Sequence, residues 1–167
     1  MHEKSDTPKT NVVRLAEKAG ILHRVHSFPV DEEHVDAATV AKNLGLDPDR
    51  VFKTLLSTDG AGAHFVFVLP GSCDLNLKKA ARAAGVKHVE LERLAELTTL
   101  TGYVRGGCSP VGMKKPFPTY IDETCELFDT IFVSAGQRGV QLELSAADLL
   151  TLCSTNGCPV ARTADLI

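Results

Sequence analysis

The apolar residues of the chain form short runs that turn residues separate. The clearest run covers residues 51–56, where five of six side chains are apolar or β-branched. Such a run predicts a buried strand. The Asp-Gly turn chemistry at residues 59–62 predicts a hairpin, whose return strand covers residues 64–69. Lys53 interrupts the first strand. A lysine in such a run either extends its ammonium to water or meets an anion in a pocket.

The remaining elements are read from the spacing of apolar positions and from turn residues. Helical periods predict helices at residues 10–19, 36–44, 74–84, 91–97 and 145–153, several of which end at a glycine. Extended patterns predict strands at residues 21–28, 86–90, 119–122, 130–134 and 140–144. Loops are expected at residues 30–35, which are acidic, at residues 98–115, and at residues 135–139.

These elements predict a single α+β domain over residues 1–167. Strands outnumber helices and short turns join several of them, which favours a mixed or antiparallel sheet, or an open barrel, with helices outside. The chain lacks the steady strand–helix alternation of a doubly wound parallel sheet. Residues 1–9 and about 155–167 are expected to be peripheral, and the tail from residue 154 is expected to pack loosely.

Composition narrows the classes of function. The formal net charge is -3 and tryptophan is absent, so any contact with nucleic acid requires a local basic patch. The five cysteines form no C-x-x-C pair, which predicts reduced thiols in a cytoplasmic protein. No apolar run is long enough to span a membrane, and the polar first residues do not resemble a signal peptide.

The candidate chemistry lacks an evident general base. Cys108 and Ser109 lie in no G-x-S-x-G nucleophile motif, and no histidine forms a motif with them. His23 and His26 would point to opposite faces of a strand, so no metal and no other cofactor is expected. What remains is Lys53 and the glycine-rich loop at residues 106–112. Together they predict a small pocket that binds a carboxylate, a phosphate or an ester carbonyl through backbone N–H groups.

Four motifs occur in the order found in one known family. They are V-F-K-T-L at residues 51–55, D-L-x-x-K-K at 74–79, T-G-Y-x-x-G-G-C-S-P-x-G at 101–112 and F-V-S-A-G-Q-R-G at 132–139. Through them the chain resembles the YbaK/EbsC family from about residue 11 to residue 153. That family is related to the editing domain of bacterial prolyl-tRNA synthetases. The resemblance implies a central mixed, barrel-like sheet flanked by helices.

The resemblance also implies trans-editing, in which a mischarged amino acid is removed from tRNA. The implied substrate is Cys-tRNA(Pro), with Cys-tRNA(Cys) as a further substrate and prolyl-tRNA synthetase as a partner. The resemblance further implies that the thiol of the substrate attacks its own ester, and that Lys53, at the position of the essential lysine of the family, anchors a phosphate or ribose. The substrate-binding positions that the resemblance implies are Thr54, Phe28, Gly106, Gly107, Cys108, Ser109, Pro110, Gly112, Ser134, Gly136, Arg138, Gly139 and Gln141.

The chain departs from the family pattern at two of these positions. Phe28 stands where the family has a tyrosine, and Gln141 stands where it has an acid. Both changes concern amino-acid specificity, so an Ala-tRNA(Pro) deacylase that uses a positioned water stays open as an alternative. A separate alternative is a non-catalytic module that binds prolyl-tRNA synthetase or tRNA.

Overall fold

Two β-sheets form the centre of the molecule. A computed structural model of the chain describes residues 8–30 and 36–167. The strands are β1 (Arg24–Ser27), β2 (Phe52–Thr58), β3 (His64–Pro70), β4 (Glu90–Leu91), β5 (Thr119–Asp122), β6 (Ile131–Gln137), β7 (Val140–Leu144) and β8 (Ala161–Ala164). The helices are α1 (Asn11–Lys18), α2 (Ala37–Leu44), α3 (Leu77–Ala84), α4 (Leu94–Thr101) and α5 (Ala146–Thr155), with 3-10 turns at Pro48–Arg50 and Glu123–Leu127.

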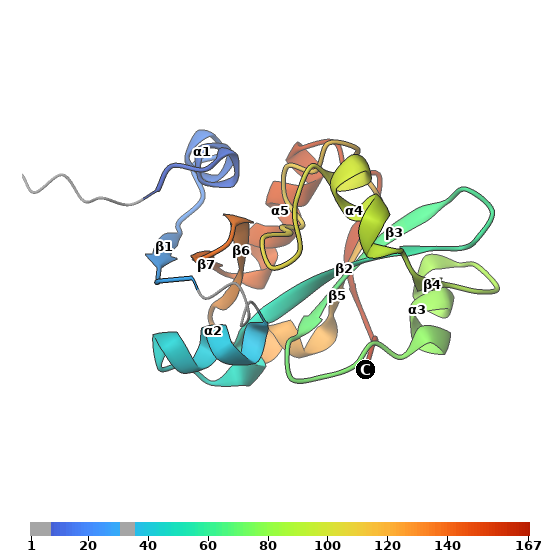
Figure 1. Cartoon of the computed structure of the whole chain (residues 1–167), viewed down its shortest axis with the longest axis horizontal. Helices are drawn as coiled ribbons and strands as arrows, with labels where there is room; N and C mark the ends of the chain where they lie inside the picture. Colours follow the sequence, from blue (N-terminus) through green and yellow to red (C-terminus); the bar gives the residue numbers. More distant parts are fainter. Residues whose placement is uncertain (1–7, 31–35) are drawn as a thin grey trace, which may run out of the picture.

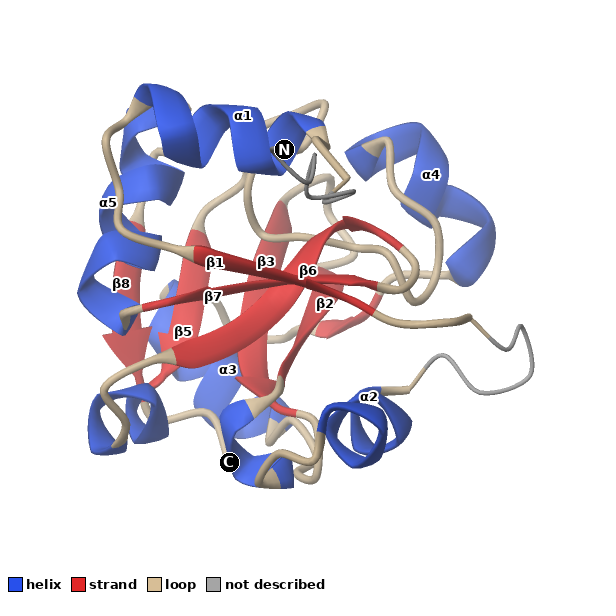
Figure 2. Ribbon diagram, turned by 90° about the vertical axis from the view of Figure 1, so that its left-hand side faces the viewer, coloured by secondary structure: helices blue, strands red, loops and turns tan. Residues whose placement is uncertain are grey.

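The larger sheet is mixed and the smaller one is antiparallel, which agrees with the mixed or antiparallel arrangement that the sequence predicts. One has the order β1-β7-β6 and is antiparallel, and the other has the order β4-β2-β3-β5-β8. In the larger sheet β3 pairs in parallel with β5, and β5 with β8, while the other pairs are antiparallel. The α+β class is therefore confirmed. The two sheets do not close into a barrel, and β1 and β7 cross over the strands of the larger sheet (Figure 2).

The main core lies between the two sheets and under two helices. Its fully buried members include Val66 and Ile121 from the larger sheet and Val133 and Leu142 from the smaller one. Helices α1 and α5 cover this core with one apolar stripe each (Figure 2). Because β2 packs against β6 as well as β3, it lies where the two sheets meet.

The segment before α4 differs from its predicted structure. The sequence predicts a strand at residues 86–90 and a helix at 91–97, but the strand is Glu90–Leu91 and α4 begins at Leu94. The cause is pairing with a distant strand, since Leu91 lies opposite Ser57 and the Glu92 amide donates to the Leu56 carbonyl. These contacts keep the chain extended where its local pattern favours helix.

The prediction of a loosely packed tail is wrong. Strand β8 pairs in parallel with β5 along its whole length. Leu166 is 0% exposed and its amide donates to the buried carboxylate of Asp122. Residues 1–7, and most of the acidic loop predicted at 30–35, lie outside the described residues.

Leu166→Ala should destabilise the fold by about 3 kcal/mol, because it removes a fully buried side chain and leaves a cavity. Chemical denaturation of both proteins would measure the loss. Leu127→Ala is the matched control, since Leu127 is 77% exposed and should change stability by less than about 0.5 kcal/mol. Equal denaturation midpoints for the two variants would show that the tail does not belong to the core.

Candidate functional site

A cavity of about 680 Å³ opens along β2. Residues 52–56 of β2 line the cavity, together with residues at the start of α2 and residues of β4 and α4. Figure 1 shows where these elements lie in the fold. The loop that follows α4, together with β6 and β7, completes it. The cavity therefore lies where the two sheets meet, and its lining comes from segments that are far apart in the sequence.

Lys53 lies on the wall of this cavity. Its side chain is half-buried, and its ammonium donates a hydrogen bond to the Gly71 carbonyl over 3.4 Å. No carboxylate forms an ion pair with it within the described part of the chain. The ammonium therefore has spare donors next to the cavity, and an anionic ligand can accept them.

Gly71 is a contributor that sequence reasoning missed. Gly71 comes directly after the last residue of β3 and lines the cavity. Its amide donates a hydrogen bond to the Val51 carbonyl over 2.8 Å. A Cβ atom at Gly71 would lie 2.1 Å from the Cβ of Ala37, at the start of α2. Only glycine allows helix α2 to approach this closely. The pairing of β2 with β3, in which Phe52 lies opposite Pro70, places the Gly71 carbonyl within reach of Lys53.

The glycine loop is held against the turn between β6 and β7. Gly106 has φ +82°, a conformation that favours glycine. A Cβ atom at Gly107 would lie 3.2 Å from the backbone nitrogen of Arg138. The Arg138 guanidinium donates through Nε to the Arg105 carbonyl over 2.8 Å. The third and fourth sequence motifs thus meet at one end of the cavity.

The structure brings together about half of the predicted site residues. Those that line the cavity are Lys53, Thr54, Gly106, Cys108, Ser134, Arg138 and Gln141. Those that do not line it are Phe28, Gly107, Ser109, Pro110, Gly112, Gly136 and Gly139. The second group contributes to the surrounding packing. For example, Phe28 packs in a small apolar cluster with Val51 and Phe132, and Gly136 allows the ring of Tyr103 to approach its backbone.

Two buried oxygens in the cavity wall have no hydrogen-bond partner among the described residues. They are Thr54 Oγ1 and Gln141 Oε1. The Gln141 side chain belongs to a residue that is only 6% exposed. A buried polar atom left unpaired costs about 1–3 kcal/mol. Since an amide oxygen only accepts, the arrangement suits a ligand that carries donors, such as an ammonium, a hydroxyl or a thiol.

The cavity contains two carboxylates that sequence reasoning missed. Asp36 caps α2 and accepts from the amide and hydroxyl of Thr39. Glu92 accepts from His64 Nε2 over 2.9 Å and from the Arg93 amide. Histidine is absent from the described residues that line the cavity. Both carboxylates therefore already accept hydrogen bonds from neighbouring groups of the protein.

The thiol of Cys108 is a poor nucleophile in this setting. Cys108 is buried in the cavity wall, and burial raises its pKa to about 12 despite a hydrogen bond with the Thr101 side chain. It is therefore protonated at neutral pH, and the thiol rather than the reactive thiolate is present. All five cysteines of the chain are free thiols.

Cys108→Ser should retain aminoacyl-ester cleavage within about tenfold of the unsubstituted protein. Loss of a true nucleophile costs several orders of magnitude in turnover. Single-turnover rates of both proteins on one charged tRNA would distinguish the two roles. A loss above about a thousandfold in a folded variant would identify Cys108 as the attacking group.

Two absences apply to the described residues alone. No group of three or more histidine, cysteine, aspartate or glutamate side chains within them could hold a metal ion. None of the helices formed by residues 8–30 and 36–167 is long and apolar enough to cross a membrane.

Comparison with known proteins gives one family. The family model of the aminoacyl-tRNA editing domain matches residues 31–152. The chain is 44% identical over 157 residues to a protein of Enterococcus faecalis, EbsC, which is provisionally named a Cys-tRNA(Pro)/Cys-tRNA(Cys) deacylase. That match covers 94% of each chain. The proline–tRNA ligase of Burkholderia orbicola is 31% identical over 102 residues, which are 59% of this chain and 18% of the ligase.

Solved structures share the fold over nearly the whole chain. A protein described provisionally as a trans-editing enzyme for prolyl-tRNA synthetase has a TM-score of 0.75 and 25% sequence identity, and the match covers 95% of this chain and 98% of that one. A hypothetical protein has a TM-score of 0.81 and 27% identity, with 93% and 97% covered.

Proposed function

The chain belongs to the aminoacyl-tRNA editing domain family, and from this premise we propose that it is a deacylase for Cys-tRNA(Pro) and Cys-tRNA(Cys). Membership of this family confirms the resemblance to YbaK/EbsC proteins that the four sequence motifs indicate. The named activity of the Enterococcus relative, which matches over 94% of both chains, supports the choice of substrate.

The observation that carries the proposal is the chemistry of the cavity. It offers a lysine with spare donors and two oxygen atoms without a partner among the described residues, its described lining has no histidine, and its two carboxylates already accept hydrogen bonds from the protein. A site of this kind positions a substrate but does not activate a water molecule. A cysteinyl ester needs only positioning, because it carries its own nucleophile.

In the proposed reaction the thiol of the cysteinyl group attacks the ester carbonyl carbon. A sulfur–carbon bond forms, the ester carbon–oxygen bond breaks, and the proton lost by the thiol passes to the ribose oxygen. The products are a cyclic thiolactone and tRNA with a free terminal hydroxyl. Lys53 binds a phosphate or ribose oxygen of the acceptor end, and backbone N–H groups of the glycine loop stabilise the developing oxyanion.

The protein is expected to bind tRNA weakly by itself. Phosphate neutralisation supplies most of the affinity of proteins for nucleic acid, and this chain carries a formal net charge of -3. We propose that prolyl-tRNA synthetase acts as a partner that delivers the charged tRNA. A salt-resistant nanomolar complex with tRNA alone would contradict this part of the proposal.

The decisive test compares Cys-tRNA(Pro), Ala-tRNA(Pro) and Pro-tRNA(Pro) as substrates of the purified protein. We expect rapid release of cysteine, slow release of alanine and no release of proline. Faster release of alanine would instead support the Ala-tRNA(Pro) alternative, in which a positioned water attacks. If Cys-tRNA(Pro) stays intact under conditions where an established deacylase cleaves it, the deacylase proposal fails. The non-catalytic binding module is then the remaining alternative.

A further inference from the structure

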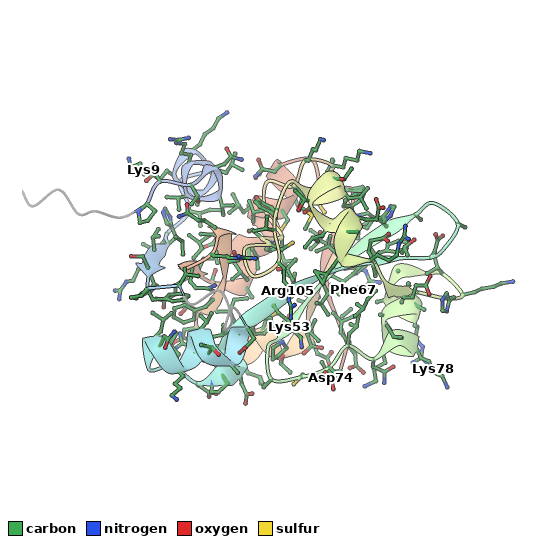
Figure 3. All side chains as sticks on the ribbon, in the orientation of Figure 1. Lys9, Lys53, Phe67, Asp74, Lys78 and Arg105 are labelled. Atoms are coloured by element: carbon green, nitrogen blue, oxygen red, sulfur yellow. The ribbon has the colours of Figure 1, made fainter. Side chains whose placement is uncertain are left out.

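Three cationic side chains line the cavity, and one of them lies outside every role assigned above. They are Lys53, Arg105 and Arg138. Arg105 comes from the loop between α4 and β5, directly before the two glycines of the third motif. Arg105 and Lys53 line the same cavity, and Figure 3 labels both in the same region of this view. The lining also holds the carboxylates of Asp36 and Glu92, so three cations against two anions leave the cavity a formal excess of one positive charge.

The charged side chains of the cavity differ in how many protein partners they have. The carboxylates are occupied, Asp36 by Thr39 and Glu92 by His64. Arg138 uses its Nε to hold the Arg105 carbonyl. Within the described part of the chain, the Arg105 guanidinium has no ion pair and no hydrogen-bond acceptor, and its residue is exposed. The guanidinium is thus a free cation beside the cavity, and an anion of the substrate can pair with it.

We infer that Arg105 binds a backbone phosphate of the acceptor end of the tRNA, an inference that rests on the proposed deacylase function. A guanidinium presents two parallel N–H donors that fit two phosphate oxygens, which a lysine ammonium does not offer. The ester and amino acid occupy the enclosed part of the cavity with Thr54 and Gln141. The exposed position of Arg105 fits the polyanionic chain that must extend from the ester into solvent.

Arg138 acts here as a positioning residue. Its Nε donates a hydrogen bond to the Arg105 carbonyl over 2.8 Å, which holds the backbone of Arg105 in place. The backbone nitrogen of Arg138 lies close to Gly107. The loop that carries Arg105 is therefore fixed at its base, while the guanidinium is free to bind. A backbone that is already fixed reduces the conformational entropy that the loop loses when Arg105 pairs with phosphate.

The inference is tested with two substrates, of which only one carries phosphate. One is Cys-tRNA(Pro), and the other is the cysteinyl ester of adenosine, which keeps the terminal nucleoside and lacks the rest of the tRNA. Arg105→Ala should raise KM for the tRNA about tenfold, with a smaller change in kcat. It should lower the salt dependence of tRNA binding by about 0.7 in log–log slope, the value for one phosphate contact in single-stranded nucleic acid. Cleavage of the adenosine ester should not change.

Two further variants sharpen the test. Arg105→Lys should restore most of the salt dependence but only part of the affinity, because it keeps the charge and loses the paired donors. Arg82→Ala is the matched control, since Arg82 is an exposed arginine on α3 that does not line the cavity. It should match the unsubstituted protein in every assay.

The outcomes separate this inference from the proposed function. Equal losses on both substrates would overturn the phosphate contact and place Arg105 in the aminoacyl pocket. Unchanged KM and salt slope for the tRNA would also overturn it. If the unsubstituted protein cleaves neither ester, the deacylase proposal fails. Binding of an acceptor-stem RNA with a single-stranded 3′ end, compared between Arg105→Ala and Arg82→Ala, then still decides whether Arg105 contacts phosphate.

Discussion

Lys53→Ala should reduce the cleavage of Cys-tRNA(Pro) by at least about 100-fold while the protein keeps its fold. The lysine places spare ammonium donors at the cavity, and removal of one preorganised donor from a reacting site typically costs about 100- to 1000-fold in turnover. Among the described residues, its ammonium donates a single hydrogen bond, a long one of 3.4 Å to the Gly71 carbonyl. Its loss should therefore change the free energy of unfolding by less than about 1 kcal/mol.

The measurement is a single-turnover deacylation rate together with a thermal denaturation curve. Lys53→Arg should also lose most of the activity, because a planar guanidinium does not replace a compact ammonium in a confined site. Lys78→Ala on α3 provides the control, since Lys78 is exposed and does not line the cavity. Full activity in a folded Lys53→Ala protein would remove this lysine from the mechanism.

Replacement of the substrate thiol by a hydroxyl should have a comparable effect. Ser-tRNA(Pro) differs from Cys-tRNA(Pro) by one atom and fills nearly the same volume. A thiol has a pKa near 8.5, so a few per cent is thiolate at neutral pH, whereas a hydroxyl provides almost no alkoxide. If the substrate supplies the nucleophile, the rate should fall at least about 100-fold with serine.

The pH dependence of the cysteine reaction gives an independent check. The rate should rise about tenfold per pH unit below the thiol pKa and level off above it, because only the thiolate attacks. Cys108 cannot produce this profile, since burial raises its pKa to about 12. Similar rates for the serine and cysteine esters would instead support attack by a positioned water.

The part of the fold with strong local signals could be predicted from the sequence. Strands β2 and β3 follow from their apolar runs and the Asp-Gly turn between them. Several helices begin at side chains that cap them, such as Ser145 before α5, whose hydroxyl accepts from the Asp148 amide. Where the structure differs, long-range pairing is the cause. Strand β8 has no apolar alternation, and its partner β5 alone makes it a strand.

The residues of the site likewise divide into those with a local sequence signal and those placed by tertiary packing. Lys53 is conspicuous because a charge interrupts an apolar strand, and the glycine loop is conspicuous through its composition. Glu92, Arg105 and Gly71 carry no such signal. Glu92 lies in a predicted helix and Arg105 in a predicted loop, and charged residues are ordinary in both. Gly71 follows a proline in what reads as a simple turn, and its close contact with Ala37 depends on how α2 packs. Tertiary packing, not local pattern, brings these three to the cavity.

The unpartnered oxygens of Thr54 and Gln141 imply a trade-off between stability and activity. Each lowers the stability of the empty protein by about 1–3 kcal/mol, because burial removes water without supplying a donor. Apolar side chains of similar size at these two positions would stabilise the fold. They would also remove the two oxygens that can accept hydrogen bonds from the substrate. Selection for thermal stability alone would therefore tend to remove these polar groups first and leave an inactive, more robust protein.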